Sequence, residues 1–128
     1  MAECYPNITV VAAHGGGAAP NLSFIPQVSA LLVPDGVKNA PEGLETYMKR
    51  MYYDTGVCAS PHALACLDAF VGSSKIVYAS DFPFAPEFLV QQGIENTDAY
   101  EGFDANAQRR INRDNSLKFL PRLSKLLA

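Results

Sequence analysis

Three side chains that can bind a metal ion or move a proton each lie at the end of a short apolar segment. They are His14, Asp54 and Asp81. A neutral imidazole is a common ligand for a catalytic metal, and a carboxylate can bind a divalent cation or accept a proton. If the three segments are neighbouring strands, the sequence indicates one site for metal-assisted or acid–base chemistry.

Each of these residues also has a structural interpretation. His14 precedes three glycines and can form a hydrogen bond within a turn. Asp54 and Asp81 can cap turns through the local backbone. His-Gly-Gly-Gly is also a form of the oxyanion-hole loop in α/β-hydrolase esterases. That class needs a G-x-S-x-G nucleophile turn, which is absent, and the later histidine, His62, falls at a predicted helix start where we expect it to be exposed.

The three apolar segments predict strands. Residues 8–13 form a continuous β-branched and apolar run, residues 51–55 are mostly aromatic, and residues 75–81 are mostly apolar. Such runs are typical of strands that are buried on both faces, as in a parallel sheet. Strands that alternate with helices predict an α/β fold, in which functional groups gather at the carboxyl ends of the strands.

The best-marked helix lies between the second and third segments. Ser60 suits the N-cap, Pro61 the first helical position and Gly72 the stop. One apolar stripe at helical spacing is made by Leu64, Leu67, Phe70 and Val71.

Other helices are predicted with weaker boundaries. They run from Pro41 through Met48, around Ile25 to Leu32, from Pro86 with fraying near Gly93, and after the capping residue Asp104. The apolar tail from Leu117 to Leu127 is predicted to pack as a closing helical segment, interrupted at Pro121.

The length, charge and cysteine content of the chain exclude several classes of protein. The chain has 128 residues, which suits one domain spanning 1–128, and a net charge of -3 gives no electrostatic basis for binding nucleic acid. No apolar run is long enough to cross a membrane, and the first residues do not resemble a signal peptide. Three cysteines, Cys4, Cys58 and Cys66, without C-x-x-C spacing favour a reduced, cytoplasmic protein.

The ordered set of motifs resembles the amidohydrolase-related superfamily, in its branch of metal-dependent decarboxylases that includes aminocarboxymuconate-semialdehyde and 6-methylsalicylate decarboxylases. The matching pieces are His14 to Pro20, Tyr52 to Thr55, Pro61 to Leu64, Val71-Gly72, Ser80 to Phe84, Asn115 and Leu120-Pro121. Each piece is weak alone, but they follow the family's order over nearly the whole chain.

The resemblance implies a (β/α)8 barrel with a divalent metal, zinc or manganese, at the carboxyl ends of its strands. His14 would match a ligand at the end of the fifth strand. Asp81 would match the aspartate at the end of the eighth, which binds the metal and handles protons. Asp54 and Phe84 would contact the substrate, a small unsaturated or aromatic carboxylic acid.

Several positions depart from the family pattern. Nothing before His14 can supply the His-x-His ligand pair of the family's first strand, so the metal site is expected to be incomplete in this chain. Ala79 stands where glycine is common, and Ser116 where alanine is common. A barrel of this kind needs about 250 residues, so we expect the chain to form its C-terminal half.

Half a barrel exposes strand edges and apolar interior. We therefore expect the chain to associate with itself or with a missing N-terminal half, and to be inactive alone. The competing hypotheses are a non-catalytic remnant that binds a full-length paralogue, and a small α/β binding module unrelated to the family.

Overall fold

Three short parallel strands form one sheet in the order β1–β2–β3. The computed structural model describes residues 5, 7–25, 28, 32 and 35–127. The strands are β1 (Val11–Ala12), β2 (Tyr52–Asp54) and β3 (Ile76–Val77). Each lies within its predicted segment and is shorter than that segment. The α/β class with parallel strands is confirmed.

The carboxyl ends of β2 and β3 stay joined beyond the paired residues because of Thr55. Its backbone N–H donates to the carbonyl of Val77 at 3.0 Å. Its hydroxyl accepts the N–H of Ala79 at 3.1 Å and donates to the carbonyl of the same residue at 3.4 Å. Thr55 is buried, so these bonds are shielded from water and hold the two strand ends side by side.

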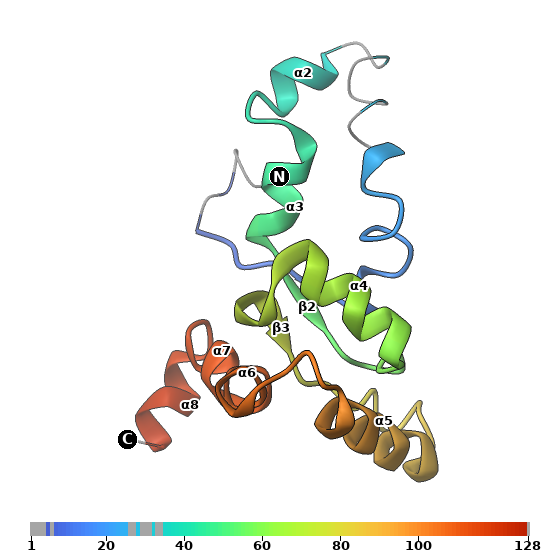
Figure 1. The fold of residues 1–128 in the computed structure, drawn as a ribbon. Coiled ribbons are helices and arrows are strands. Elements are labelled where there is room, and N and C mark those ends of the chain that lie inside the picture. Colours follow the sequence, from blue (N-terminus) through green and yellow to red (C-terminus); the bar gives the residue numbers. More distant parts are fainter. Residues whose placement is uncertain (1–4, 6, 26–27, 29–31, 33–34, 128) are drawn as a thin grey trace.

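The predicted helix between the second and third strands is confirmed as α4 (Pro61–Val71). The Ser60 hydroxyl accepts the N–H of Ala63, and Gly72 ends the helix with φ +69°. Figure 1 shows α4 lying along the strands. Leu64 and Leu67 from its apolar stripe are buried and pack with Tyr53 and Ile76 of the sheet in the main core.

The remaining helices lie around this core or extend beyond it, as α2 and α8 do (Figure 1). They are η1 (His14–Gly16), α2 (Gly36–Asn39), α3 (Leu44–Arg50), η2 (Ser73–Lys75), α5 (Glu87–Ala99), α6 (Ala105–Arg109), the π-helix η3 (Arg110–Asp114), α7 (Asn115–Leu117) and α8 (Pro121–Leu126). None of the helices in the described part of the chain has the length and apolar character needed to span a bilayer.

Several helix predictions can be compared with these elements. The helix after Pro41 is confirmed as α3, and Asp104 caps α6 by accepting the N–H of Ala107 at 2.7 Å. The predicted fraying near Gly93 is wrong, because α5 continues through it to Ala99 and the Thr97 hydroxyl bonds back to the Gly93 carbonyl. The helix predicted around Ile25 to Leu32 lies largely outside the described residues.

The prediction that the C-terminal tail packs against the rest of the chain is wrong for α8. The helix does begin at Pro121, but none of its residues is buried. Leu126 is 81% exposed. Its apolar residues have no core to join because α8 extends from α7 away from the sheet (Figure 1).

The resemblance implies that His14 follows the fifth strand and Asp81 the eighth, and these two strand numbers cannot both be right. Placing His14 after a fifth strand and Asp81 after an eighth requires two strands between them. The sheet has one, since β1 pairs directly with β2 and β2 with β3. If Asp81 follows the eighth strand of a barrel, His14 follows the sixth. A metal-binding role for His14 must therefore rest on its chemistry rather than on its strand number.

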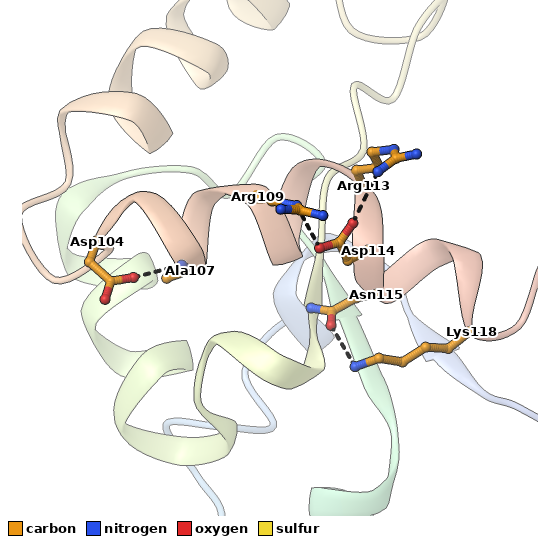
Figure 2. A network of polar contacts seen from close by, with 7 residues as sticks. All are labelled: Asp104, Ala107, Arg109, Arg113, Asp114, Asn115 and Lys118. Carbon is orange, nitrogen blue, oxygen red and sulfur yellow. Dashed lines mark hydrogen bonds and ion pairs between the residues drawn. The ribbon is translucent and has the colours of Figure 1, made fainter. Parts of the chain in front are cut away.

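The π-helix and α7 fix the start of β3 through a buried amide. Asn115 is fully buried, and its Nδ2 donates to the carbonyls of Ser73 at 2.8 Å and Ile76 at 2.7 Å. Its Oδ1 accepts the ammonium of Lys118 at 3.0 Å (Figure 2). Just beyond the end of β3, the carbonyl of Ile111 accepts the N–H of Tyr78 at 3.0 Å.

Ion pairs on the same helices contribute less. Asp114 lies between Arg109 at 3.0 Å and Arg113 at 3.6 Å (Figure 2). Both arginine side chains are about half exposed or more, so each pair is worth at most about 1 kcal/mol. The buried amide of Asn115 is thus the main polar connection between the C-terminal helices and the sheet.

We predict that Asn115→Ala lowers the free energy of unfolding by roughly 2–4 kcal/mol, because the buried carbonyl of Ile76 and the part-buried carbonyl of Ser73 lose their donor. Urea unfolding followed by circular dichroism measures the change. Asn112→Ala is the matched control: Asn112 lies in the adjoining π-helix η3 and is exposed, so its change should stay within about 0.5 kcal/mol. Equal effects of the two substitutions would contradict this account.

Candidate functional site

The three residues selected from the sequence converge on one glycine at the carboxyl edge of the sheet. A Cβ atom placed on Gly56 would lie 3.3 Å from Asp54 Oδ1, 3.4 Å from His14 Nδ1 and 3.6 Å from Asp81 Cβ. Gly56 is buried among them. Sequence reasoning missed this residue, although a glycine directly after a strand end, where side chains gather, is a recognisable sign of close approach.

His14 is oriented by the backbone after β2. Its Nδ1 lies 3.2 Å from the Gly56 carbonyl. A carbonyl can only accept, so Nδ1 is the donor in this bond, and in the neutral ring the lone pair is on Nε2. Such a histidine can bind a cation or accept a proton through Nε2, and the side chain is exposed enough to be reached from solvent.

Asp54 joins the ends of β1 and β2. Its Oδ1 accepts the backbone N–H of His14 at 2.7 Å and that of Gly56 at 3.0 Å. The alternative in which this carboxylate bonds the backbone is therefore supported. A carboxylate that accepts two N–H groups is held in place, and here it holds the histidine backbone as well. Substrate binding by Asp54 stays a prediction.

Asp81 follows β3 and is half-buried beside Gly56. Its backbone has φ +59°, and that of His14 has φ +54°. A residue with a Cβ atom is disfavoured by about 1–2 kcal/mol in this left-handed region, and residues held there gather at active sites and ligand-binding positions. The two candidate metal ligands therefore share a costly conformation, and both lie against the same glycine.

The segment after Asp81 carries the fourth predicted site residue. The peptide bond between Phe82 and Pro83 is cis, and the carbonyl of Asp81 accepts the N–H of Ala85 at 2.8 Å. Phe84 lies in this turn and is 88% exposed. The structure thus places Phe84 at the same edge of the sheet, while its contact with substrate stays a prediction.

Two cavities adjoin the cluster. One of about 170 Å³ lies between the ends of β2 and β3 and helix α5, and is lined by Thr55, Val57, Tyr78, Ser80 and Leu89 among others. The other, of about 40 Å³, is lined by His14, Cys58 and Cys66 among others.

Neither Cys58 nor Cys66 forms a disulfide, and Cys4 lies outside the described residues. Burial, and then the neighbouring Asp54 carboxylate, raise the pKa of Cys58 to about 11. At neutral pH this thiol is therefore protonated and unreactive. Cys58 fits the role of a packed side chain better than that of a nucleophile.

The donor set for a metal is partial within the described residues. They contain no group of three His, Cys, Asp or Glu side chains arranged to hold an ion. His14 and Asp81 approach the same glycine, but a catalytic zinc takes three protein ligands. These two residues supply a suitable imidazole and carboxylate, and further donors would have to come from elsewhere.

Comparison with known proteins decides the family. A family model described as amidohydrolase matches residues 1–122. This chain belongs to the amidohydrolase family. The amidohydrolase chain is 27% identical over 123 residues to 6-methylsalicylic acid decarboxylase from Penicillium expansum, and 23% identical over 121 residues to decarboxylase yanB from Aspergillus niger. The resemblance to the decarboxylase branch is therefore confirmed.

These matches span 96% and 91% of the amidohydrolase chain but 38% and 32% of the two relatives. The chain thus spans about a third of the length of the curated relatives it matches.

Solved structures show the same fold over this region. The manganese-bound 5-carboxyvanillate decarboxylase from Novosphingobium aromaticivorans superposes with a TM-score of 0.77 at 19% identity, over 94% of this amidohydrolase chain and 35% of that chain. The 2,6-dihydroxybenzoate decarboxylase from Rhizobium gives 0.73 at 14% identity, over 94% and 36%. The arrangement of strands and helices described above is therefore shared with part of each of these proteins.

We predict that Gly56→Ala displaces the His14 imidazole, because the added methyl would meet Asp54 Oδ1 and His14 Nδ1 at 3.3 and 3.4 Å. The His14 ring signals in an NMR spectrum should shift, and stability should fall by about 1–3 kcal/mol. Gly93→Ala is the control, since its added methyl meets only Ala59 at 3.9 Å. Unchanged His14 signals in Gly56→Ala would contradict the close packing.

We also predict that Asp54→Asn speeds alkylation of Cys58. Removing the carboxylate removes one of the causes that raise the pKa of the thiol, so a larger fraction is thiolate at a given pH between 8 and 10. Mass spectrometry of the labelled peptide gives the rate. Cys66 provides an internal control in each sample. A rate at Cys58 equal to that of the wild type would show that its pKa does not depend on Asp54.

Proposed function

We propose that this chain forms part of a metal-dependent decarboxylase acting on a small aromatic or unsaturated carboxylic acid. The observation that carries the proposal is the convergence of His14, Asp54 and Asp81 on Gly56 at the carboxyl edge of a parallel sheet. This edge is where ligands bind in α/β folds. The decarboxylase names of both relatives support a carboxylic acid as substrate.

The proposed whole is a (β/α)8 barrel, of which residues 1–128 form one domain fragment at the C-terminal side. Three consecutive parallel strands that each pair with the next, with α4 and α5 after β2 and β3, support this arrangement. Apolar side chains at the open edge and end of the sheet also support it, since Val11 of β1 is 39% exposed and Ile8 is 57% exposed. The partner is the rest of the barrel, or a second copy of the chain.

The metal, zinc or manganese, would be held by the Asp81 carboxylate and by His14 through Nε2, with the remaining ligands outside the described residues. Manganese in the 5-carboxyvanillate decarboxylase structure supports a divalent cation. When bound, such an ion supplies positive charge that polarises an acidic substrate. The chain would therefore be inactive without the missing donors.

The side chains of this chain have distinct proposed roles. Asp81 exchanges a proton with the substrate as carbon dioxide leaves. Asp54 holds the His14 backbone and contributes to substrate binding, and Phe84 covers the substrate from the solvent side. Because Nδ1 of His14 is occupied by the Gly56 carbonyl, the Nε2 of His14 is the atom that faces either the metal or the substrate.

Divalent-metal binding tests this proposal. Titration calorimetry with Mn²⁺ and Zn²⁺ should show binding to the wild-type chain, and the affinity should fall at least about tenfold in Asp81→Asn and in His14→Ala. His62→Ala and Asp98→Asn are matched controls, because both residues are exposed and lie on helices outside the cluster. They should bind metal like the wild type.

The outcomes separate the roles. If only Asp81→Asn loses affinity for the metal, His14 does not bind the metal, and its proposed role is contact with the substrate. No binding by the wild type, with no gain when the aligned remainder of a relative is added, would contradict the metal site and favour a non-catalytic interaction partner.

A further inference from the structure

Val57 occupies a backbone conformation that a valine rarely adopts. Its φ is +48°, and a β-branched residue in the left-handed region is a strong outlier. Residues 55–58 form a tight turn, closed by a hydrogen bond from the Cys58 N–H to the Thr55 carbonyl at 3.2 Å. At the third position of a turn with positive φ, glycine or asparagine is the usual residue.

The glycine of this turn lies one residue earlier, at Gly56. That position needs glycine because His14, Asp54 and Asp81 crowd it. The neighbouring position needs glycine for its backbone angle, yet it carries an isopropyl group.

Packing within the described chain does not account for this side chain. Val57 is 57% exposed. The burial of its apolar surface therefore contributes little free energy to offset the strained backbone. The side chain instead lies at the boundary between two features of the site. Its backbone continues directly from Gly56, and it lines the cavity of about 170 Å³ beside Thr55 and Ser80.

We propose that Val57 is a specificity-determining residue, whose isopropyl group contacts the aromatic ring of the acid bound at the Gly56 cluster. This rests on the proposed function. The cavity has apolar walls, here Leu89 and Val90. An apolar group fixed beside such a cavity favours the binding of an aromatic ring over that of a charged or strongly hydrated ligand. The strained turn persists because it directs the side chain toward the substrate rather than into the core.

Three variants of the 128-residue chain test this inference. Val57→Gly relieves the strain and removes the contact, so the thermal midpoint should rise by roughly 4 °C, while the dissociation constant for 2,6-dihydroxybenzoate in the presence of Mn²⁺ should rise at least about tenfold. Val57→Ala keeps the strained backbone and removes two methyls, so binding should weaken without the gain in midpoint. Leu126→Ala removes another exposed apolar side chain, far along the chain in α8, and should change neither.

Binding is measured by NMR titration of the acid, and the midpoint by circular dichroism. A fall in midpoint for Val57→Gly would overturn the inference, since it would show that packing retains the valine. A rise in midpoint with unchanged affinity would overturn it as well. If the wild type binds Mn²⁺ but not the acid, the inference fails while the metal-site proposal stands. If it binds neither, both fail.

Discussion

The carboxylate of Asp54 connects the ends of β1 and β2, and the geometry of the site depends on this connection. One oxygen accepts N–H groups from His14 and Gly56, two residues separated by more than forty positions in sequence. The His14 imidazole then bonds back to the Gly56 carbonyl, so side chain and backbone close a small cycle. A carboxylate with two charge-assisted bonds is a rigid support, whereas a neutral amide would bond each N–H more weakly.

This rigidity is needed because the groups around Gly56 are not in relaxed conformations. His14, Val57 and Asp81 all have positive φ, and each such residue carries an energetic cost. The cost is offset away from the site. Thr55 ties β2 to β3 through Ala79, and Asn115 fixes the start of β3 from the opposite end. Asp81 is thus held at the end of a strand whose other end is anchored by the buried amide of Asn115.

The features that sequence predicted correctly depend on local interactions. Ser60 and Gly72 bound α4 because capping involves residues three or four apart, and the three strands follow from β-branched and aromatic runs. The convergence of His14, Asp54 and Asp81 followed from the general geometry of parallel sheets. The contacts of Asn115 join groups some forty residues apart, so no local pattern predicts them. Gly56, in contrast, has a local sign, since it is a glycine directly after a predicted strand. The packing of the tail was predicted wrongly because an apolar stripe specifies a buried face but not what covers it.

That last point applies to the sheet as a whole. A parallel sheet is normally covered on both faces, yet Ile8 and Val11 near β1 remain exposed, as do Phe82 and Phe84 beyond β3. Helix α4 and the core cluster cover the face that Tyr53 and Ile76 share. Asp54 and Tyr52 alternate with Tyr53 along β2, so the strand pleat places them on the opposite face. In the proposed barrel that face would be the interior, and the missing strands would cover it. The proposed metal site lies at the rim of the same surface, so completing the barrel would complete the core and the proposed site together.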